Sequence, residues 1–180
     1  VKIADEVSQY GTLSGGIADV RIWSVARTQT EIDNNKNRTL IGSESGLEAY
    51  YLFEDNQVQD LSPNDNDGTL QNGATINTTT TNNIISGNLI LEVGNKSLGE
   101  NIKPLNVDIK DNRVLSLDGS NDYVNIGEQA ELRFDGVKPY TMSAWIKPET
   151  GGGTIISKHN GGVIGSYILS LRNDGKILAH

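Results

Sequence analysis

The chain has 180 residues, enough for one domain or two small ones with a buried core. Its 23 acidic residues outnumber 15 basic ones and give a net charge of −8, which argues against a nucleic-acid-binding surface. The chain has no cysteine, so disulfides and thiolate metal sites are excluded. No apolar run approaches the ~18 residues of a membrane-spanning helix, so no membrane insertion is expected.

The first predicted strand lies in "GGIADVRIW", residues 15–23, where apolar and polar residues alternate. The alternation places three aliphatic residues on one face: Ala18, Val20 and Ile22. It places three others on the opposite face: Asp19, Arg21 and Trp23. This pattern is typical of a strand with one buried face.

A short surface helix is predicted in "TQTEIDNNKNRTL", residues 28–40. Thr28 and Glu31 are spaced as in a capping box, in which each side chain binds the backbone of the other residue. Ile32, together with Leu40, supplies a thin apolar stripe. The asparagines that follow have low helix propensity and should end the helix within about three turns.

Further strands follow the same period of two. In "LEAYYLFE" the alternation places Leu47, Ala49, Tyr51 and Phe53 on one side. In "YTMSAWIKP" Met142, Ala144 and Ile146 oppose Thr141, Ser143 and Trp145, and in "YILSL" the residues on one side are Tyr167, Leu169 and Leu171. The "NDG" at Asn173–Gly175 predicts a hairpin turn. The chain is therefore predicted to be all-β, an antiparallel β-sandwich or jelly roll with one short surface helix.

The segment at residues 76–113 differs in composition from the rest of the chain. "ATINTTTTNN" is polar and of low complexity, which is typical of a linker or an exposed edge. Within the same segment, "NLILEVGN" has strand character and could pair with a sheet edge. We therefore expect this segment to separate residues 1–75 from residues 114–180.

Both flanking parts resemble a LamG-like jelly-roll domain of the concanavalin A-like lectin/glucanase superfamily. "GGIADVRIWSVARTQTEI" and "GLEAYYLFEDNQVQDLSPNDNDGTLQNG" resemble its closing part. "LSLDGSNDYVNIG", "YTMSAWIKP" and "YILSLRNDGKIL" resemble its opening part. The motif order thus runs from end to beginning, and the central strands of such a domain do not appear in the sequence.

Three accounts of this order stay open. The chain is a window on a tandem array, which is the favoured account, with the missing strands supplied by neighbours. Alternatively, it is one permuted domain in which "NLILEV" replaces lost strands, or each half is completed by a neighbouring chain. Half a jelly roll would expose apolar faces and unpaired edges, so something must cover them.

Catalysis is not expected from these residues. "EID" at Glu31–Asp33 echoes a glycosidase motif, but retaining hydrolysis needs two carboxyls about 5 Å apart on one strand. Asn35 and Lys36 occupy the positions where the second carboxylate should follow. The segment is also predicted to form a capped helix, not a strand. His159 lies in the turn-like "SKHNGG" without a serine–histidine–aspartate pattern. We therefore expect a non-catalytic protein.

Calcium is the predicted ligand with the best chemical match. Ca²⁺ prefers several carboxylate, amide and backbone oxygens. Two segments concentrate such groups, "QDLSPNDNDG" and "DGSNDY", and the resemblance implies that they lie close together. The predicted ligands are Asp118, Asp122, Asn121, Asp60 and Asp65. Tight turns demand the same residue types, and this alternative stays open.

Carbohydrate binding would use exposed aromatic side chains, for which Trp23 and Trp145 are the candidates. Since tryptophans are mostly buried, a core position is favoured for Trp145. The resemblance implies a non-catalytic extracellular adhesion module of a cell-surface or secreted protein, which binds glycans or proteins with or without calcium. The alternative is a structural repeat of a surface fibre or filament, completed by tandem domains or other copies of the chain.

Overall fold

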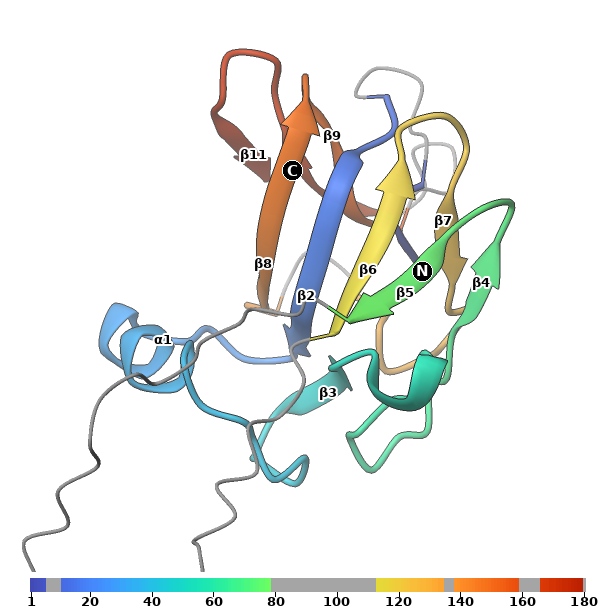
Figure 1. Cartoon of the computed structure of the whole chain (residues 1–180). Helices are drawn as coiled ribbons and strands as arrows, with labels where there is room; N and C mark the ends of the chain where they lie inside the picture. The colour runs from blue at the N-terminus through green and yellow to red at the C-terminus, as the bar shows by residue number, and fades with distance from the viewer. Residues whose placement is uncertain (6–10, 79–112, 135–137, 159–165, 180) are drawn as a thin grey trace, which may run out of the picture.

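The computed structural model describes residues 1–5, 11–78, 113–134, 138–158 and 166–179. In these residues the protein is mostly β-strand, with two antiparallel sheets facing each other and one α-helix (Figure 1). The predicted all-β sandwich with a short surface helix is therefore confirmed.

The first sheet has six strands in the order β11-β10-β9-β1-β7-β4. Their bounds are Ile177–Ala179, Tyr167–Leu171, Gly153–Lys158, Lys2–Ile3, Tyr123–Asn125 and Thr69–Gln71. The second sheet has the order β3-β2-β6-β5, and β8 also pairs with β2. These strands span Leu47–Tyr51, Ser14–Trp23, Arg113–Asp118, Thr75–Thr78 and, for β8, Thr141–Thr150. The predicted hairpin at Asn173–Gly175 joins β10 to β11.

Strands from both ends of the chain build both sheets. In the first sheet, β1 lies between β7 and β9. In the second, β2 pairs with β6 and with β8 (Figure 1). At the borders of the predicted linker, β5 reaches Thr78 and β6 begins at Arg113. The predicted edge strand "NLILEV" lies outside the described residues.

A β-bulge in β2 changes which residues face the core. The register against β8 shifts between Ala18, opposite Trp145, and Arg21, opposite Ser143. The extra residue, Asp19, takes a positive φ of 52°. The predicted grouping of Ala18 with Val20 and Ile22 on one face is therefore wrong: the fully buried residues of this strand are Ile17, Val20 and Ile22. The reason is that a bulge reverses the alternation of faces on one side of it.

The main core fills the space between the two sheets. It includes Ala49, Tyr51 and Phe53 from the second predicted strand, together with Leu115 and Ile156. A second, smaller cluster lies on the outer face of the second sheet: Trp23, Leu40, Leu47 and Tyr50, with Leu52 and Leu61 against it. A second register shift, in β3, separates Leu47 from Ala49 and Tyr51, with which it was predicted to share a side, and places it in this outer cluster.

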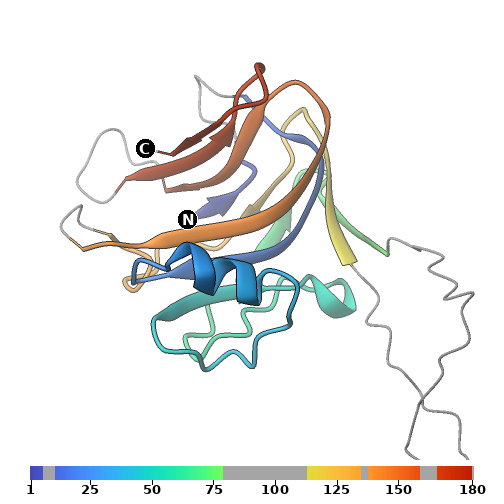
Figure 2. The same ribbon diagram turned by 90° about the vertical axis from the view of Figure 1, so that its left-hand side faces the viewer.

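The helix α1 spans Gln29–Asn35 and lies on the outer side of the second sheet (Figure 2). The predicted capping box is present, because the Thr28 hydroxyl accepts from the Glu31 N–H at 3.3 Å and Glu31 Oε2 accepts from the Thr28 N–H at 2.8 Å. The hydrogen bonds that the Glu31 carboxylate accepts from the Thr28 N–H and from the Thr28 hydroxyl lower the pKa of Glu31. Leu40 lies beyond the helix, in the outer cluster.

A η1 turn at Glu54–Asn56 follows β3. Phe53, Asp55 and Asn56 all have positive φ values, between 55° and 59°. Such a run is uncommon for residues other than glycine. The turn lies beside the outer cluster, and its Glu54 lines a hollow of the candidate site.

Candidate functional site

Trp145 is an exposed tryptophan on the outer face of β8. Its side chain is 51% exposed. The core position favoured from the sequence is therefore wrong: Trp145 lies opposite Ala18 on the outward side, and Met142, Ala144 and Ile146 take the inward side. Trp23 is the buried one, at 3% exposure, because the outer cluster covers it.

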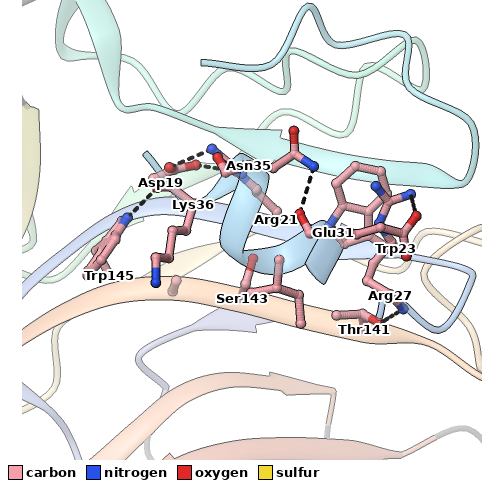
Figure 3. Close-up of a pocket in the computed structure, with 12 residues that line it drawn as sticks. Asp19, Arg21, Trp23, Arg27, Glu31, Asn35, Lys36, Thr141, Ser143 and Trp145 are labelled. Atoms are coloured by element: carbon pink, nitrogen blue, oxygen red, sulfur yellow. Dashed lines mark hydrogen bonds and ion pairs between the residues drawn. The ribbon is translucent and has the colours of Figure 1, made fainter. Parts of the chain in front are cut away.

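Two neighbouring hollows meet at Trp145. The first, of about 200 Å³, lies between α1 and β8 and is lined by Trp23, Ile32 and Ser143 among others (Figure 3). The second, of about 500 Å³, extends toward Tyr50, Glu54 and Arg113. Three residues line both hollows: Asp19, Lys36 and Trp145. We call the two hollows together the Trp145 groove.

A buried ion pair fixes the acidic residue where the hollows meet. Arg21 Nε donates to Asp19 Oδ1 at 2.6 Å and Arg21 Nη2 donates to Oδ2 at 2.7 Å. The Arg21 side chain is only 4% exposed. Burial raises the pKa of the Asp19 carboxyl, and the adjacent Arg21 guanidinium partly opposes the rise. The Asp19 carboxylate is thus held in one orientation by a two-point contact.

The same arginine holds the end of the helix. Arg21 Nη1 donates to the Asn35 carbonyl at 2.9 Å, and Nη2 donates to the Arg38 carbonyl at 2.6 Å. The Trp145 indole N–H donates to the Lys36 carbonyl at 3.0 Å (Figure 3). Carbonyls at a helix end lack partners within the helix, so these bonds satisfy them and fix the Trp145 ring.

The chemistry of the groove suits a ligand with apolar and hydroxyl-bearing faces. An indole ring offers a flat apolar surface, while carboxylate, hydroxyl and cationic groups fix the orientation of a bound ligand. Around Trp145 these groups are Asp19, Lys36, Ser143 and Arg113. The sequence marked Trp145 as a candidate and placed Asp19 and Arg21 together on one face of their strand. It gave no signal for Arg113, which is 92 positions away from Arg21 and reaches the groove through strand pairing.

The residues of the "EID" motif have structural partners. Glu31 caps the helix, and Asp33 accepts from Gln29 Nε2 at 3.1 Å and from Lys36 Nζ at 2.8 Å. Both side chains lie on α1, as predicted, and not on a strand. His159 lies outside the described residues.

Of the predicted calcium ligands in the first segment, Asp60 is buried and Asp65 is exposed. Asp60 accepts hydrogen bonds from the backbone N–H groups of Tyr50, Ser62 and Asn66, each at 2.9 Å. Asp65 has a positive φ of 53°. Asp60 therefore organises the loop that follows β3, as buried carboxylates at turns commonly do.

In the second segment, Asp122 is 3% exposed and its Oδ2 accepts from the Asp118 N–H at 2.9 Å. Its Oδ1 is buried without a hydrogen-bond partner in the described part of the chain. Asp118 is exposed and accepts from the Ser120 N–H at 2.7 Å. The Asn121 carbonyl accepts from Asn72 Nδ2 at 2.7 Å.

The structure does not bring the two segments together at one point. Asp60 bonds to residues 66 and 67, just before β4, whereas Asp122 lies against Gly73, just after β4. The described residues contain no group of three or more His, Asp or Glu side chains placed to hold a metal ion. Calcium binding stays a prediction.

Comparison with known proteins identifies no relative: no family model, curated protein or solved structure matches the chain. Among the helices of the described residues, none has the length and apolar character needed to cross a membrane.

Proposed function

We propose that the protein is a non-catalytic glycan-binding module and that the Trp145 groove is its binding site. The observation that carries the proposal is Trp145 itself: a half-exposed indole, fixed by its hydrogen bond to Lys36, where two hollows meet. Exposed aromatic side chains with a fixed orientation lose little entropy when they bind, so they are effective anchors for ligands. Asp19 beside the ring supplies a fixed acceptor for sugar hydroxyls.

Membership of the LamG-like group of concanavalin A-like domains is part of this proposal. Its support is the motif order in the sequence and the two-sheet antiparallel sandwich. Adhesion at a cell surface or after secretion follows from that resemblance, as does a contribution from calcium. A protein ligand in place of a glycan is a separate outcome of the experiments below.

A glycan array with the wild-type chain and Trp145→Ala tests the proposal. Wild type is expected to bind a defined set of glycans, and the variant should lose at least tenfold in affinity, about 1.4 kcal/mol. Ile177→Ala is the matched control, because Ile177 is also an exposed large apolar residue, at 56%, but lies in the other sheet. Equal binding by wild type and Trp145→Ala would refute the assignment of the site.

The same array in EDTA tests calcium separately. A signal that falls on chelation and returns with added Ca²⁺ supports calcium-dependent binding. If Asp122 is a ligand, Asp122→Asn should abolish the response to EDTA without abolishing folding.

A second candidate function, a structural repeat completed by another copy of the chain, has its own supporting observation. Among the described residues β8 pairs only with β2, so its other edge is unpaired there. Met142, Ala144 and Ile146 on its inner face are only partly buried. Two β8 strands related by a two-fold axis would pair antiparallel and cover both edges.

Light scattering over a range of concentrations tests this candidate. Assembly through β8 predicts dimers or larger species that Ile146→Lys converts to monomers, while Ile177→Lys in β11 leaves them intact. A monomer at all concentrations would exclude assembly of this chain through β8.

A further inference from the structure

The two hollows differ in size and in chemistry. The first, of about 200 Å³, is smaller than the ~300–1,000 Å³ of pockets that enclose a whole small ligand. Apolar groups dominate its walls, with Trp23, Ile32 and Ala144 around it and the Ser143 hydroxyl among them. It therefore fits a small group with an apolar end, such as a methyl group on a polar stem.

The second hollow, of about 500 Å³, is large enough for a sugar ring and more polar. Asn37, Thr39, Glu54 and Arg113 line it. A lining with both hydrogen-bond donors and acceptors suits a sugar ring that carries several hydroxyls. Because Trp145 lines both hollows, a ligand that filled both would cross its indole face.

Hydrogen bonds of Arg21 hold the floor of the groove in place on both sides of Trp145. The bulge in β2 directs Asp19 outward, and Arg21 holds its carboxylate. Arg21 also binds the carbonyls of Asn35 and Arg38, so the helix wall of the first hollow is tied to the same residue. A preformed groove of this kind binds an extended ligand at a lower entropic cost than a flexible surface does.

We propose, as an extension of the proposed function, that the groove binds an N-acetylated glycan at least two sugar units long. An acetamido group occupies the first hollow, with its methyl among Trp23, Ile32 and Ala144 and its amide at Ser143. The adjoining sugar ring lies over Trp145 and reaches the polar second hollow. A single terminal sugar fills only one of the two hollows.

Calorimetry with chito-oligosaccharides of one to six units tests the length requirement, and cello-oligosaccharides of equal length are the matched probe without acetamido groups. Affinity for the chito series should rise at least tenfold from one unit to three and then level off. The cello series should bind at least tenfold more weakly at each length.

Two variants test which part of the ligand each hollow binds. Ser143→Trp, which fills the first hollow, should remove the difference between the chito and cello series. Thr39→Trp, which fills the second, should remove the gain in affinity with length. Ile177→Ala should change neither, and circular dichroism establishes that each variant is folded.

The failures of the two proposals are distinguishable. Binding of the monosaccharide as tight as that of the trimer overturns the inferred length requirement, while dependence on Trp145 would leave the glycan site in place. Equal affinity for the chito and cello series in wild type, or no binding of either, overturns the acetamido assignment. Binding that is unaffected by Trp145→Ala overturns the glycan site itself.

Discussion

Arg21 and Asp19 form a buried two-point polar contact. A buried guanidinium is costly unless its donors are used, and Arg21 uses them on one carboxylate and two carbonyls. The contact links β2, the helix end and the groove. Its energy therefore bears on the stability of the fold as well as on the shape of the site.

Replacing Arg21 by methionine should lower the free energy of unfolding by about 2–3 kcal/mol. The value lies at or below the ~3–5 kcal/mol typical of a broken buried pair, because the Asp19 side chain is 17% exposed and regains some hydration. Urea denaturation measures the change. The double variant Arg21→Met with Asp19→Asn should recover part of the loss, since it leaves no unpaired charge and asparagine tolerates the positive φ of this position. A loss below 0.5 kcal/mol in the single variant would contradict this role.

The ionisation of Asp19 should make ligand binding depend on pH. Its pKa is raised, so Asp19 gains a proton at a higher pH than the ~3.9 of an ordinary aspartate. The carboxylate acceptor is present above this raised pKa, and binding should weaken as the pH falls through it. Calorimetry from pH 7 to pH 4 measures the effect. Asp19→Asn should abolish the pH dependence, whereas the same slope in that variant would assign it to another group.

At the scale of elements, α1 forms one wall of the first hollow and depends on its cap. Thr28→Ala removes the acceptor for the Glu31 N–H and should cost about 1 kcal/mol of stability, within the ~0.5–2 kcal/mol measured for such caps. Thermal unfolding measures the loss. Thr30→Ala, an exposed threonine of the same helix, is the control and should leave stability nearly unchanged. An equal loss of stability in both variants would show that the loss does not come from the cap, because alanine has a higher helix propensity than threonine.

The pKa of Glu31 adds a pH dependence to the same helix. Because hydrogen bonding lowers this pKa in the folded state, the cap contributes fully above the unfolded value of ~4.3 and is lost as the pH falls through the folded value. The stability difference between wild type and Thr28→Ala should therefore shrink at low pH.

The strands, the helix cap and the hairpin were predictable because each depends on short-range patterns. Alternation marked β8 and β10, and the spacing of Thr28 and Glu31 marked α1. The bulge at Asp19 was not predictable, because no local signal distinguishes an extra residue from regular alternation. The error at Trp145 has a different cause: its face followed from the pattern, but which face packs between the sheets depends on tertiary contacts.

The candidate site was predictable in part for the same reason. Trp145, Asp19 and Arg21 lie on two strands whose alternating faces the sequence showed, although it did not show which face points outward. That they meet Lys36 from the helix end and Arg113 from β6 depends on pairing between residues about 100 positions apart. Asp60 and Asp122 have the composition of cation ligands, but their partners in the structure are backbone N–H groups.

At the scale of the whole molecule, strand pairing joins the two ends of the chain. β1 and β2 precede the predicted linker, yet β1 pairs with β7 and β9, and β2 pairs with β6 and β8. The main core likewise contains Ile17 and Val20 from the first part together with Leu115 and Ile156 from the second. A permuted single domain requires this sharing, whereas two tandem half-domains would not need it.

Cutting the chain within residues 79–112 distinguishes these accounts. A protease site inserted after residue 95 should be cleavable without separating the two fragments, because hydrogen bonds of both sheets and the common core hold them together. Size-exclusion chromatography should show both fragments at the elution volume of the uncut protein, with the uncut insertion variant as control. They should separate only in denaturant, where the core is lost. Independent elution of the fragments in native buffer would instead favour pieces of two tandem domains, each completed by another part of a longer chain or by a neighbour.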